Sequence, residues 1–184
     1  MGAGHILPIG TSNPKTGAVQ FDGRRIDGVP FVIPSGAGVS TAVVGSIVTL
    51  QEDSTGNQVI VLGAAAYETS GYDQYEIIAV GFLEAGLQAD GSINQTVGSY
   101  VNGDTAVMVI DINVIAAVPT VPGSVPTAGG VAYITAAGKL SSSNTSAVAF
   151  PGSVFFGTAG QQNTGQLKTG YCFARLATNM IGTV

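Results

Sequence analysis

Short apolar segments alternate with polar turns along the chain from Val29 onward. The segments "TAVVGSIVTLQ" and "QVIVLGAAA" flank the polar stretch "EDSTGN", which is the pattern of a β-hairpin. Further along, "EIIAVGFLEA", "VAYITAAGKLSS", "GSVFFGTAG" and the alternating "YCFARL" continue the pattern. Valine, isoleucine and threonine are frequent in these segments, and their branched β-carbons favour sheets over helices. The pattern therefore predicts a series of short antiparallel strands, about one for every ten residues.

The most apolar stretch is "DTAVMVIDINVIAAVPTVPGS", residues 104–124. A membrane-spanning helix needs about 18–20 apolar residues, and Asp111 and Asn113 interrupt this stretch well before that length. Its many β-branched residues predict one long strand instead. With a period of two, one face of that strand is wholly apolar and consists of Ala106, Met108, Ile110, Ile112 and Val114. The prolines of "TVPGSVPTAGG" then predict a connector.

These elements predict an all-β fold, an antiparallel β-sandwich or barrel of jelly-roll-like form with little helix. A short helix is expected at most at Asp73–Ile78 or near the C-terminal end. Residues 1–28 have no sustained period, and they predict an extended N-terminal arm with one short strand around Ala18–Phe21. The domain proper is expected over residues 29–184, in one piece or as two lobes, 29–97 and 98–184.

Charged residues make up 9% of the chain, compared with about 25% in an ordinary soluble domain. So few charges predict that much of the surface is buried against other subunits. The net charge of −5 and the single basic pair, Arg24-Arg25, do not fit nucleic-acid binding, which requires clustered cations. The N-terminal stretch "MGAGHILPIGTSNPK" lacks both the charged region and the long apolar region of a secretion signal.

Few residues of the chain offer catalytic or metal-binding chemistry. The single histidine, His5, lies in the expected arm, whereas a Ser-His-Asp relay requires a fixed imidazole backed by a carboxylate. No serine occurs in a G-x-S-x-G context. The single cysteine, Cys172, lies within "YCFARL", where a buried and unreactive thiol is expected. We therefore expect no enzymatic activity, no cofactor and no metal site.

The stretch "YETSGYDQYE" brings together three tyrosines and three carboxylates: Tyr67, Glu68, Tyr72, Asp73, Tyr75 and Glu76. It lacks the alternating oxygen ligands and the glycine turn of a calcium-binding loop. A solvated loop or a subunit contact is the expected role, and a glycan-binding loop of a tail-fibre or adhesin domain is the alternative. As a pair of glycosidase carboxylates, Asp73 and Glu76 fit no better than any two acids would.

Five short motifs follow one another in the second half of the chain: Gly103-Asp104, Ala128-Gly129-Gly130-Val131-Ala132-Tyr133, Gly138-Lys139-Leu140, Gly157-Thr158-Ala159 and Ala174-Arg175-Leu176. In this order they resemble the small cement or decoration proteins on the heads of tailed bacteriophages. In that family a "G-D-x-V" strand precedes an "A-G-x-x-V-Y-x-x-x-x-G-x-L" hairpin. A "G-x-a" strand and a closing "G-x-x-x-V-R-L"-like strand then follow. The resemblance covers roughly residues 98–177.

The resemblance implies a β-sandwich or barrel that assembles as a homotrimer on the outer surface of the capsid and bridges neighbouring major capsid proteins. Such a protein is made in the host cytoplasm, ends in the virion, and binds the major capsid protein and other copies of itself. It binds neither nucleic acid nor membrane and has no catalytic site. The candidate contact residues lie in the arm and in the tyrosine-rich stretch: Ile6, Leu7, Arg24, Arg25, Tyr67, Tyr72 and Tyr75.

Overall fold

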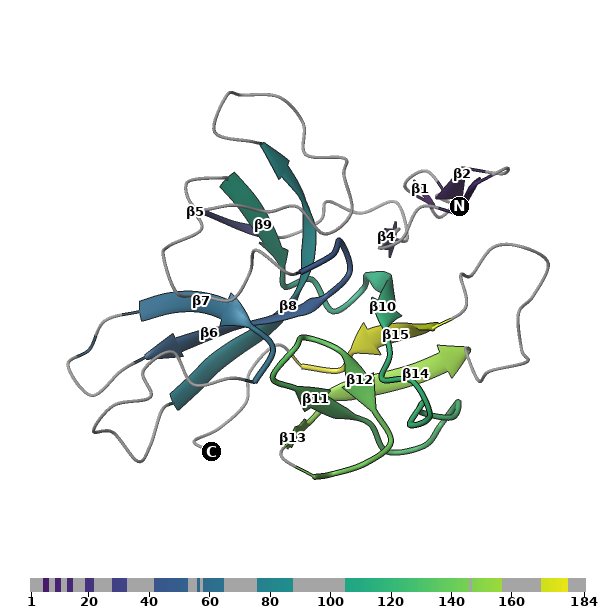
Figure 1. Ribbon diagram of the computed structural model, residues 1–184. Helices are drawn as coiled ribbons and strands as arrows, with labels where there is room; N and C mark the ends of the chain where they lie inside the picture. The colour runs from purple at the N-terminus through teal and green to yellow at the C-terminus, as the bar shows by residue number, and fades with distance from the viewer. Residues whose placement is uncertain are drawn as a thin grey trace.

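A computed structural model of the chain shows an all-β architecture (Figure 1). It describes residues 42–52, 56, 58–64, 76–87, 105–145, 147–156 and 170–178, together with the short strands that precede them. No helix occurs among these residues. The strands are β1 (His5–Ile6), β2 (Ile9–Gly10), β3 (Asn13–Pro14), β4 (Val19–Phe21), β5 (Gly28–Val32), β6 (Ile47–Glu52), β7 (Gln58–Leu62), β8 (Glu76–Leu87), β9 (Thr105–Val109), β10 (Ile115–Pro119), β11 (Tyr133–Thr135), β12 (Leu140–Ser141), β13 (Ala147–Ala149), β14 (Gly152–Phe156) and β15 (Tyr171–Leu176).

The strands form two five-stranded sheets, one three-stranded sheet and the separate pair β2-β3. One large sheet, here the β15 sheet, has the order β1-β4-β10-β15-β14. The other, here the β8 sheet, has the order β5-β9-β8-β6-β7 and is curled. The small sheet has the order β12-β11-β13. Neighbouring strands of both large sheets are antiparallel in every register that the structure describes, which confirms the predicted all-β fold. Glu76–Ile78 belong to β8, so the helix considered for Asp73–Ile78 is wrong at these residues.

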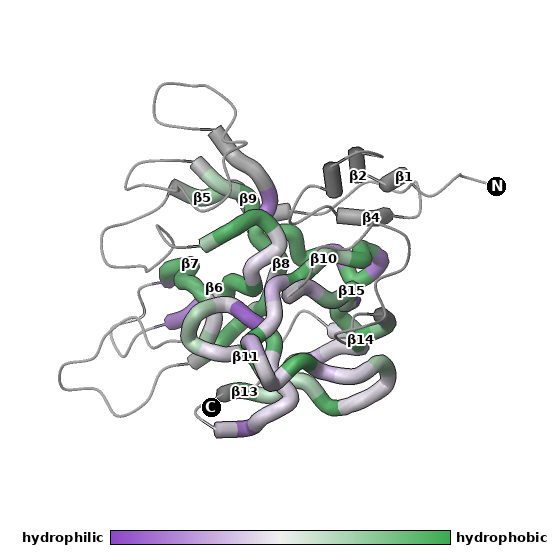
Figure 2. Tube along the Cα trace, turned by 45° about the vertical axis from the view of Figure 1, so that its right-hand side comes forward, coloured by the Kyte–Doolittle hydropathy of each residue, from purple (hydrophilic) through white to green (hydrophobic). Residues whose placement is uncertain are grey.

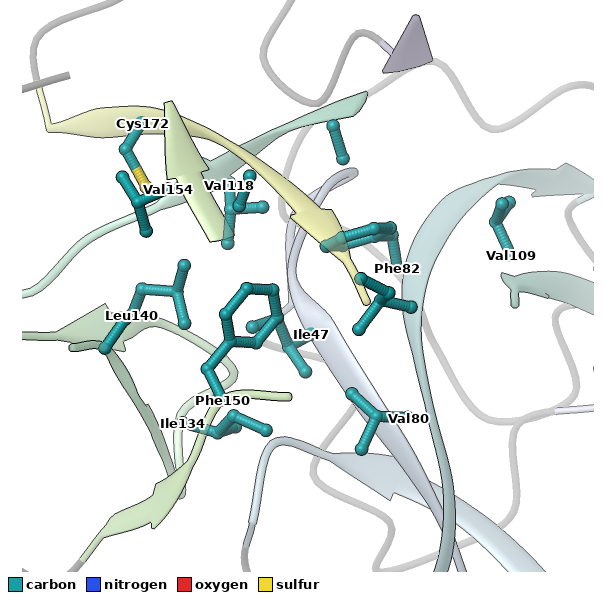
Figure 3. Packing of buried hydrophobic residues seen from close by; sticks show 14 of the residues in the cluster. Ile47, Val80, Phe82, Val109, Val118, Ile134, Leu140, Phe150, Val154 and Cys172 are labelled. Carbon is teal, nitrogen blue, oxygen red and sulfur yellow. The ribbon is translucent and has the colours of Figure 1, made fainter. Parts of the chain in front are cut away.

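One hydrophobic core joins the two large sheets and the small sheet. Figure 3 shows Cys172, Val154 and Val118 pointing from the β15 sheet toward Leu140 and Phe150. The ring of Phe150 lies 6.5 Å from that of Phe82 on β8, at an angle of 51°, a tilted geometry that aromatic pairs favour. The buried members of this core are Ile47, Ala64, Ile77, Val80, Phe82, Val109, Val114, Ala116, Val118, Ala132, Ile134, Leu140, Phe150, Val154, Cys172, Ala174 and Leu176.

A second cluster covers the opposite face of the β8 sheet. Apolar segments run through β6–β10 in the tube coloured by hydropathy (Figure 2). Gly81 on β8 makes room for this cluster, because a β-carbon there would lie 2.5 Å from Cγ of Met108 on β9. The β8 sheet is therefore apolar on both faces, as expected of a sheet packed on both sides. The buried members of the second cluster are Ala42, Val48, Ile60, Val61, Leu62, Leu83, Ala106 and Met108.

The single long strand predicted over residues 104–118 is wrong, because the chain turns in the middle of this stretch. The side chain of Asp111 accepts hydrogen bonds from the backbone N–H of Asn113 at 2.8 Å and from its side-chain amide at 2.9 Å. This turn ends β9 and sends β10 into the other large sheet. The predicted apolar face is broken accordingly: Met108 belongs to the second cluster, Val114 to the central core, and Ile112 is 46% exposed.

The β11–β12 hairpin follows its predicted alternation. Ala132 and Ile134 are buried, whereas Tyr133 and Thr135 are half-buried and Val131 is 68% exposed. The tip of the hairpin contacts the β6–β7 region through backbone hydrogen bonds. The N–H of Ile47 donates to the carbonyl of Gly138 at 2.9 Å, and the N–H of Ala64 donates to the carbonyl of Thr135 at 3.1 Å. These bonds connect the small sheet directly to the β8 sheet.

The N-terminal residues contribute to the β15 sheet of their own chain. Strand β4 lies where the sequence predicts a strand, around Ala18–Phe21, and pairs with β10 at Ile115 and Ala116. On its other side it pairs with β1. Strand β9 pairs with both β5 and β8. One hydrogen-bonded sheet therefore contains strands from both of the ranges considered as lobes, 29–97 and 98–184.

Candidate interaction surface

Most of the candidate contact residues lie outside the described part of the chain. These are Leu7, Arg24, Arg25, Tyr67, Tyr72 and Tyr75. Ile6 lies in β1, where its backbone is paired with Gln20 of β4. The acids Glu68 and Asp73 also lie outside the described residues, and Glu76 is the first residue of β8.

The buried thiol of Cys172 has an environment that suppresses reactivity. Cys172 is buried in the central core between the β15 sheet and the small sheet. Burial raises the pKa of this thiol to about 12, because an apolar environment disfavours the charged thiolate. Nucleophilic cysteines need the opposite, a lowered pKa and access to solvent. The thiol therefore acts as a small core side chain, as its position in an alternating strand predicts.

Acidic groups are scattered over the described residues. No group of three or more His, Cys, Asp or Glu residues is placed to hold a metal ion within the described ranges. Among the described carboxyl groups, Glu84 on β8 has a raised pKa, because its burial disfavours the charged form. The described part of the chain also contains no helix long and apolar enough to cross a membrane.

The outer face of the β15 sheet carries side chains of a different kind from the core. Strand β15 alternates: Cys172, Ala174 and Leu176 are buried, whereas the residues between them are half-buried or exposed. Because successive side chains of a strand point to opposite faces, Phe173 and Arg175 project away from the core. None of the outward residues of β10, β14 and β15 belongs to either hydrophobic cluster of the described chain.

Arg175 lies at the centre of this outer face. Its register partners are Ile115 on β10 and Ser153 on β14, so it has a neighbour on each side across the sheet. The guanidinium carbon of Arg175 lies 5.3 Å from the centre of the Phe155 ring, within the range of a cation–π contact. No carboxylate among the described residues forms an ion pair with Arg175. We call this surface the Arg175 face; it consists of Ile115, Ser153, Phe155, Tyr171, Phe173 and Arg175.

The contact between Phe155 and Arg175 lies beside an irregularity in the pairing of β14. The pairing of β14 with β15 shifts between Val154 and Phe156, so Phe155 is the extra residue. Ser153 is exposed and Val154 is buried, so alternation places Phe155 on the outer face, where its ring contacts the guanidinium group of Arg175. The sequence contains one sign of this surface, the alternation of "YCFARL", but nothing in "GSVFFG" reveals the bulge. Neither segment shows which strands become neighbours, so the sequence did not point to Phe155, Phe173 or Arg175 as surface residues.

No protein-family model, curated protein or solved structure matches this chain. The fold defines the chain as an all-β protein, in which two antiparallel sheets and a smaller sheet surround a common core.

Proposed function

We propose that this protein is a structural component of a virion, a cement or decoration protein that binds the outer surface of a tailed-bacteriophage head as an oligomer and bridges major capsid proteins. The observation that carries the proposal is the order of motifs that resembles this family. Along the chain, Gly103-Asp104 come directly before β9, and Gly138-Lys139-Leu140 close the β11–β12 hairpin. The segment Ala174-Arg175-Leu176 ends β15.

The character of the described surface supports the same role. A cement protein stabilises a shell by burying surface at contacts with capsid proteins and with other copies of itself. Apolar burial contributes about 25 cal/mol per Å², from which a large entropic cost of association is subtracted. Repetition of one modest contact over a shell multiplies its effect. The Arg175 face, with aromatic and arginine side chains and few charges around it, has the composition of such contacts.

The experiment that tests the proposal is co-sedimentation of the purified protein with heads of the phage that encodes it. Binding to the heads, and greater resistance of the decorated heads to heat, are the expected results. A protein that never sediments with heads contradicts the proposal.

The arm is tested with the double variant Arg24→Ala/Arg25→Ala, since β1 and β4 belong to the sheet and deletion of residues 1–28 would remove them. The control is Lys139→Ala, which removes a cation from the hairpin turn instead. We expect weaker head binding for the double variant and unchanged binding for the control. Equal binding of both variants would exclude the arginine pair as a capsid contact.

A further inference from the structure

We infer that the Arg175 face is a contact between copies of this chain, in which it meets a different, carboxylate-bearing surface of the next copy. The inference rests on the oligomeric state in the proposed function and adds to it the surface that is used. Its starting point is the position of Arg175, exposed and flanked by Ile115 and Ser153 on the outer face of the β15 sheet.

Two phenylalanines of this face lie outside the two packed clusters of the described chain. Phe155 and Phe173 are half-buried, and neither is a member of a hydrophobic cluster of the described residues. Aromatic residues and arginine are enriched in the centres of protein–protein interfaces, where they provide most of the binding energy. The face is also part of a hydrogen-bonded sheet, whose strands hold the side chains in fixed positions. A pre-ordered surface of this kind loses little conformational entropy when it is covered.

The stacking on Phe155 prepares the guanidinium group for a carboxylate. The guanidinium carbon lies 5.3 Å from the centre of the ring, and a cation–π contact of this kind leaves the N–H donors of the group available for hydrogen bonds. These donors match the two oxygens of a carboxylate in a bidentate pair. The rest of the Arg175 face carries no charged residue: Ile115, Ser153, Phe155, Tyr171 and Phe173. An acidic surface would therefore meet one well-oriented cation surrounded by apolar and neutral groups.

A second copy of this chain supplies that acidity. The chain has eleven acidic and six basic residues and a net charge of −5, so a second copy offers more carboxylates than cations to an oriented arginine. A ring of copies is built from contacts between two different patches of the chain. The Arg175 face must then meet another patch, which avoids placing two Arg175 side chains against each other.

The test uses two variants with the same change in charge. Arg175→Glu and Lys139→Glu each replace a cation by an anion. Each substitution removes a charge of +1 and adds one of −1, so the net charge changes from −5 to −7. Lys139 lies in the hairpin turn, and its described hydrogen bonds are made by its backbone. Sedimentation velocity over about 1–100 μM protein gives the dissociation constants, and far-ultraviolet circular dichroism verifies that each variant is folded.

We expect the wild-type chain to self-associate, Arg175→Glu to raise the dissociation constant at least about tenfold, and Lys139→Glu to change it less than about twofold. Added salt is expected to weaken the wild-type assembly more than that of Arg175→Ala, because only the wild type has the ion pair. A wild-type chain that stays monomeric, or equal assembly of both glutamate variants, overturns the inference.

A labelling experiment distinguishes contact with a different patch from contact with the same face. Ser153 is exposed beside Arg175, and the chain's only cysteine, Cys172, is buried. In the variant Ser153→Cys, we expect assembly to slow thiol labelling at position 153 without forming disulfide-linked dimers. Efficient disulfide formation would show that two Arg175 faces meet, and unchanged labelling would show that the face stays uncovered; either result overturns the inference.

The outcome is separable from that of the capsid proposal. If Arg175→Glu blocks self-association and the wild type does not bind phage heads, the self-contact stands and the capsid role fails. If the wild type binds heads as a monomer, head binding stands, whereas the oligomeric state in the proposed function and this inference both fail.

Discussion

Gly63 packs against the backbone of Gly138, and neither residue has room for a side chain. A β-carbon on Gly63 would lie 2.5 Å from the backbone nitrogen of Gly138, and one on Gly138 would lie 2.6 Å from the carbonyl oxygen of Ile47. Both residues have a positive φ, 59° and 67° respectively. This contact fixes the tip of the β11–β12 hairpin against the β8 sheet, and several measurable consequences follow from it and from the core around it.

Gly138→Ala is expected to destabilise the fold by about 2–5 kcal/mol. A left-handed backbone costs an alanine roughly 1–2 kcal/mol, and the overlap with Ile47 and Leu62 adds about 1–3 kcal/mol. The matched control is Gly123→Ala, because Gly123 has a φ of 77° and no atom within 4 Å of an added β-carbon. Urea unfolding of the two variants separates the crowding from the backbone cost. Equal losses in both would show that the hairpin contact is not tightly packed.

Thr120→Val is expected to stabilise the protein by about 1 kcal/mol. Thr120 is 3% exposed, and its hydroxyl group finds no hydrogen-bond partner among the described residues. An unpaired buried hydroxyl group costs free energy, and valine has nearly the same shape without that group. Thermal unfolding gives the change. A loss of stability in this variant would indicate that the hydroxyl group has a partner, such as a bound water molecule.

Thr49→Val is expected to have the opposite effect, a loss of about 1–3 kcal/mol. Thr49 is fully buried like Thr120, but its hydroxyl group donates to the carbonyl of Gly63 at 2.6 Å and accepts from the Gln51 amide at 2.9 Å. The same substitution at two buried threonines thus differs in sign because the hydrogen bonds differ. Parallel urea titrations test the pair, and a stabilising Thr49→Val would contradict the hydrogen-bond assignment.

Cys172 is expected to react with thiol reagents only after unfolding. Its thiol is buried, and its raised pKa of about 12 keeps it protonated at pH 8. Labelling with a chromogenic disulfide at that pH should be slow in buffer and complete within minutes in urea. Because Cys172 is the chain's only cysteine, the labelling rate reports opening of the central core. Rapid labelling without urea would mean that this core opens easily.

Glu84→Gln is expected to flatten the dependence of stability on pH. Burial raises the pKa of Glu84 in the folded chain above that of the unfolded chain. The folded state therefore holds this proton more tightly, and the free energy of unfolding falls as pH rises from the ordinary carboxyl value through the raised one. The effect is less than about 1 kcal/mol because the group is only half-buried. Urea midpoints between pH 4 and 7 test it; a variant with the wild-type slope would contradict the assignment.

Local pattern predicted most of the strands, because the alternation of side chains reports directly which face of a strand is buried. The bounds of β15 and the burial of Ala132 and Ile134 follow from period two alone. The turn at Asp111 could not be recognised in the same way. Its cause is a side-chain hydrogen bond to Asn113, and the apolar residues on either side continue the strand-like composition without a glycine or proline.

The candidate surface was harder to predict than the fold. The sequence drew attention to conspicuous residues, the Arg24-Arg25 pair and the tyrosines of residues 67–75, which lie outside the described residues. The Arg175 face depends instead on which strands become neighbours and on the register between them. Both are tertiary properties, and no spacing of residues along the chain encodes the distance between Arg175 and Phe155.

The position of β15 also bears on how the chain folds as it is made. This strand lies between β10 and β14, yet it follows both in the sequence. A ribosome therefore releases the two neighbours before the strand that joins them exists, and their apolar faces await a partner. The β15 sheet therefore closes only once synthesis has passed Leu176, and until then the nascent chain exposes apolar strand faces that favour aggregation.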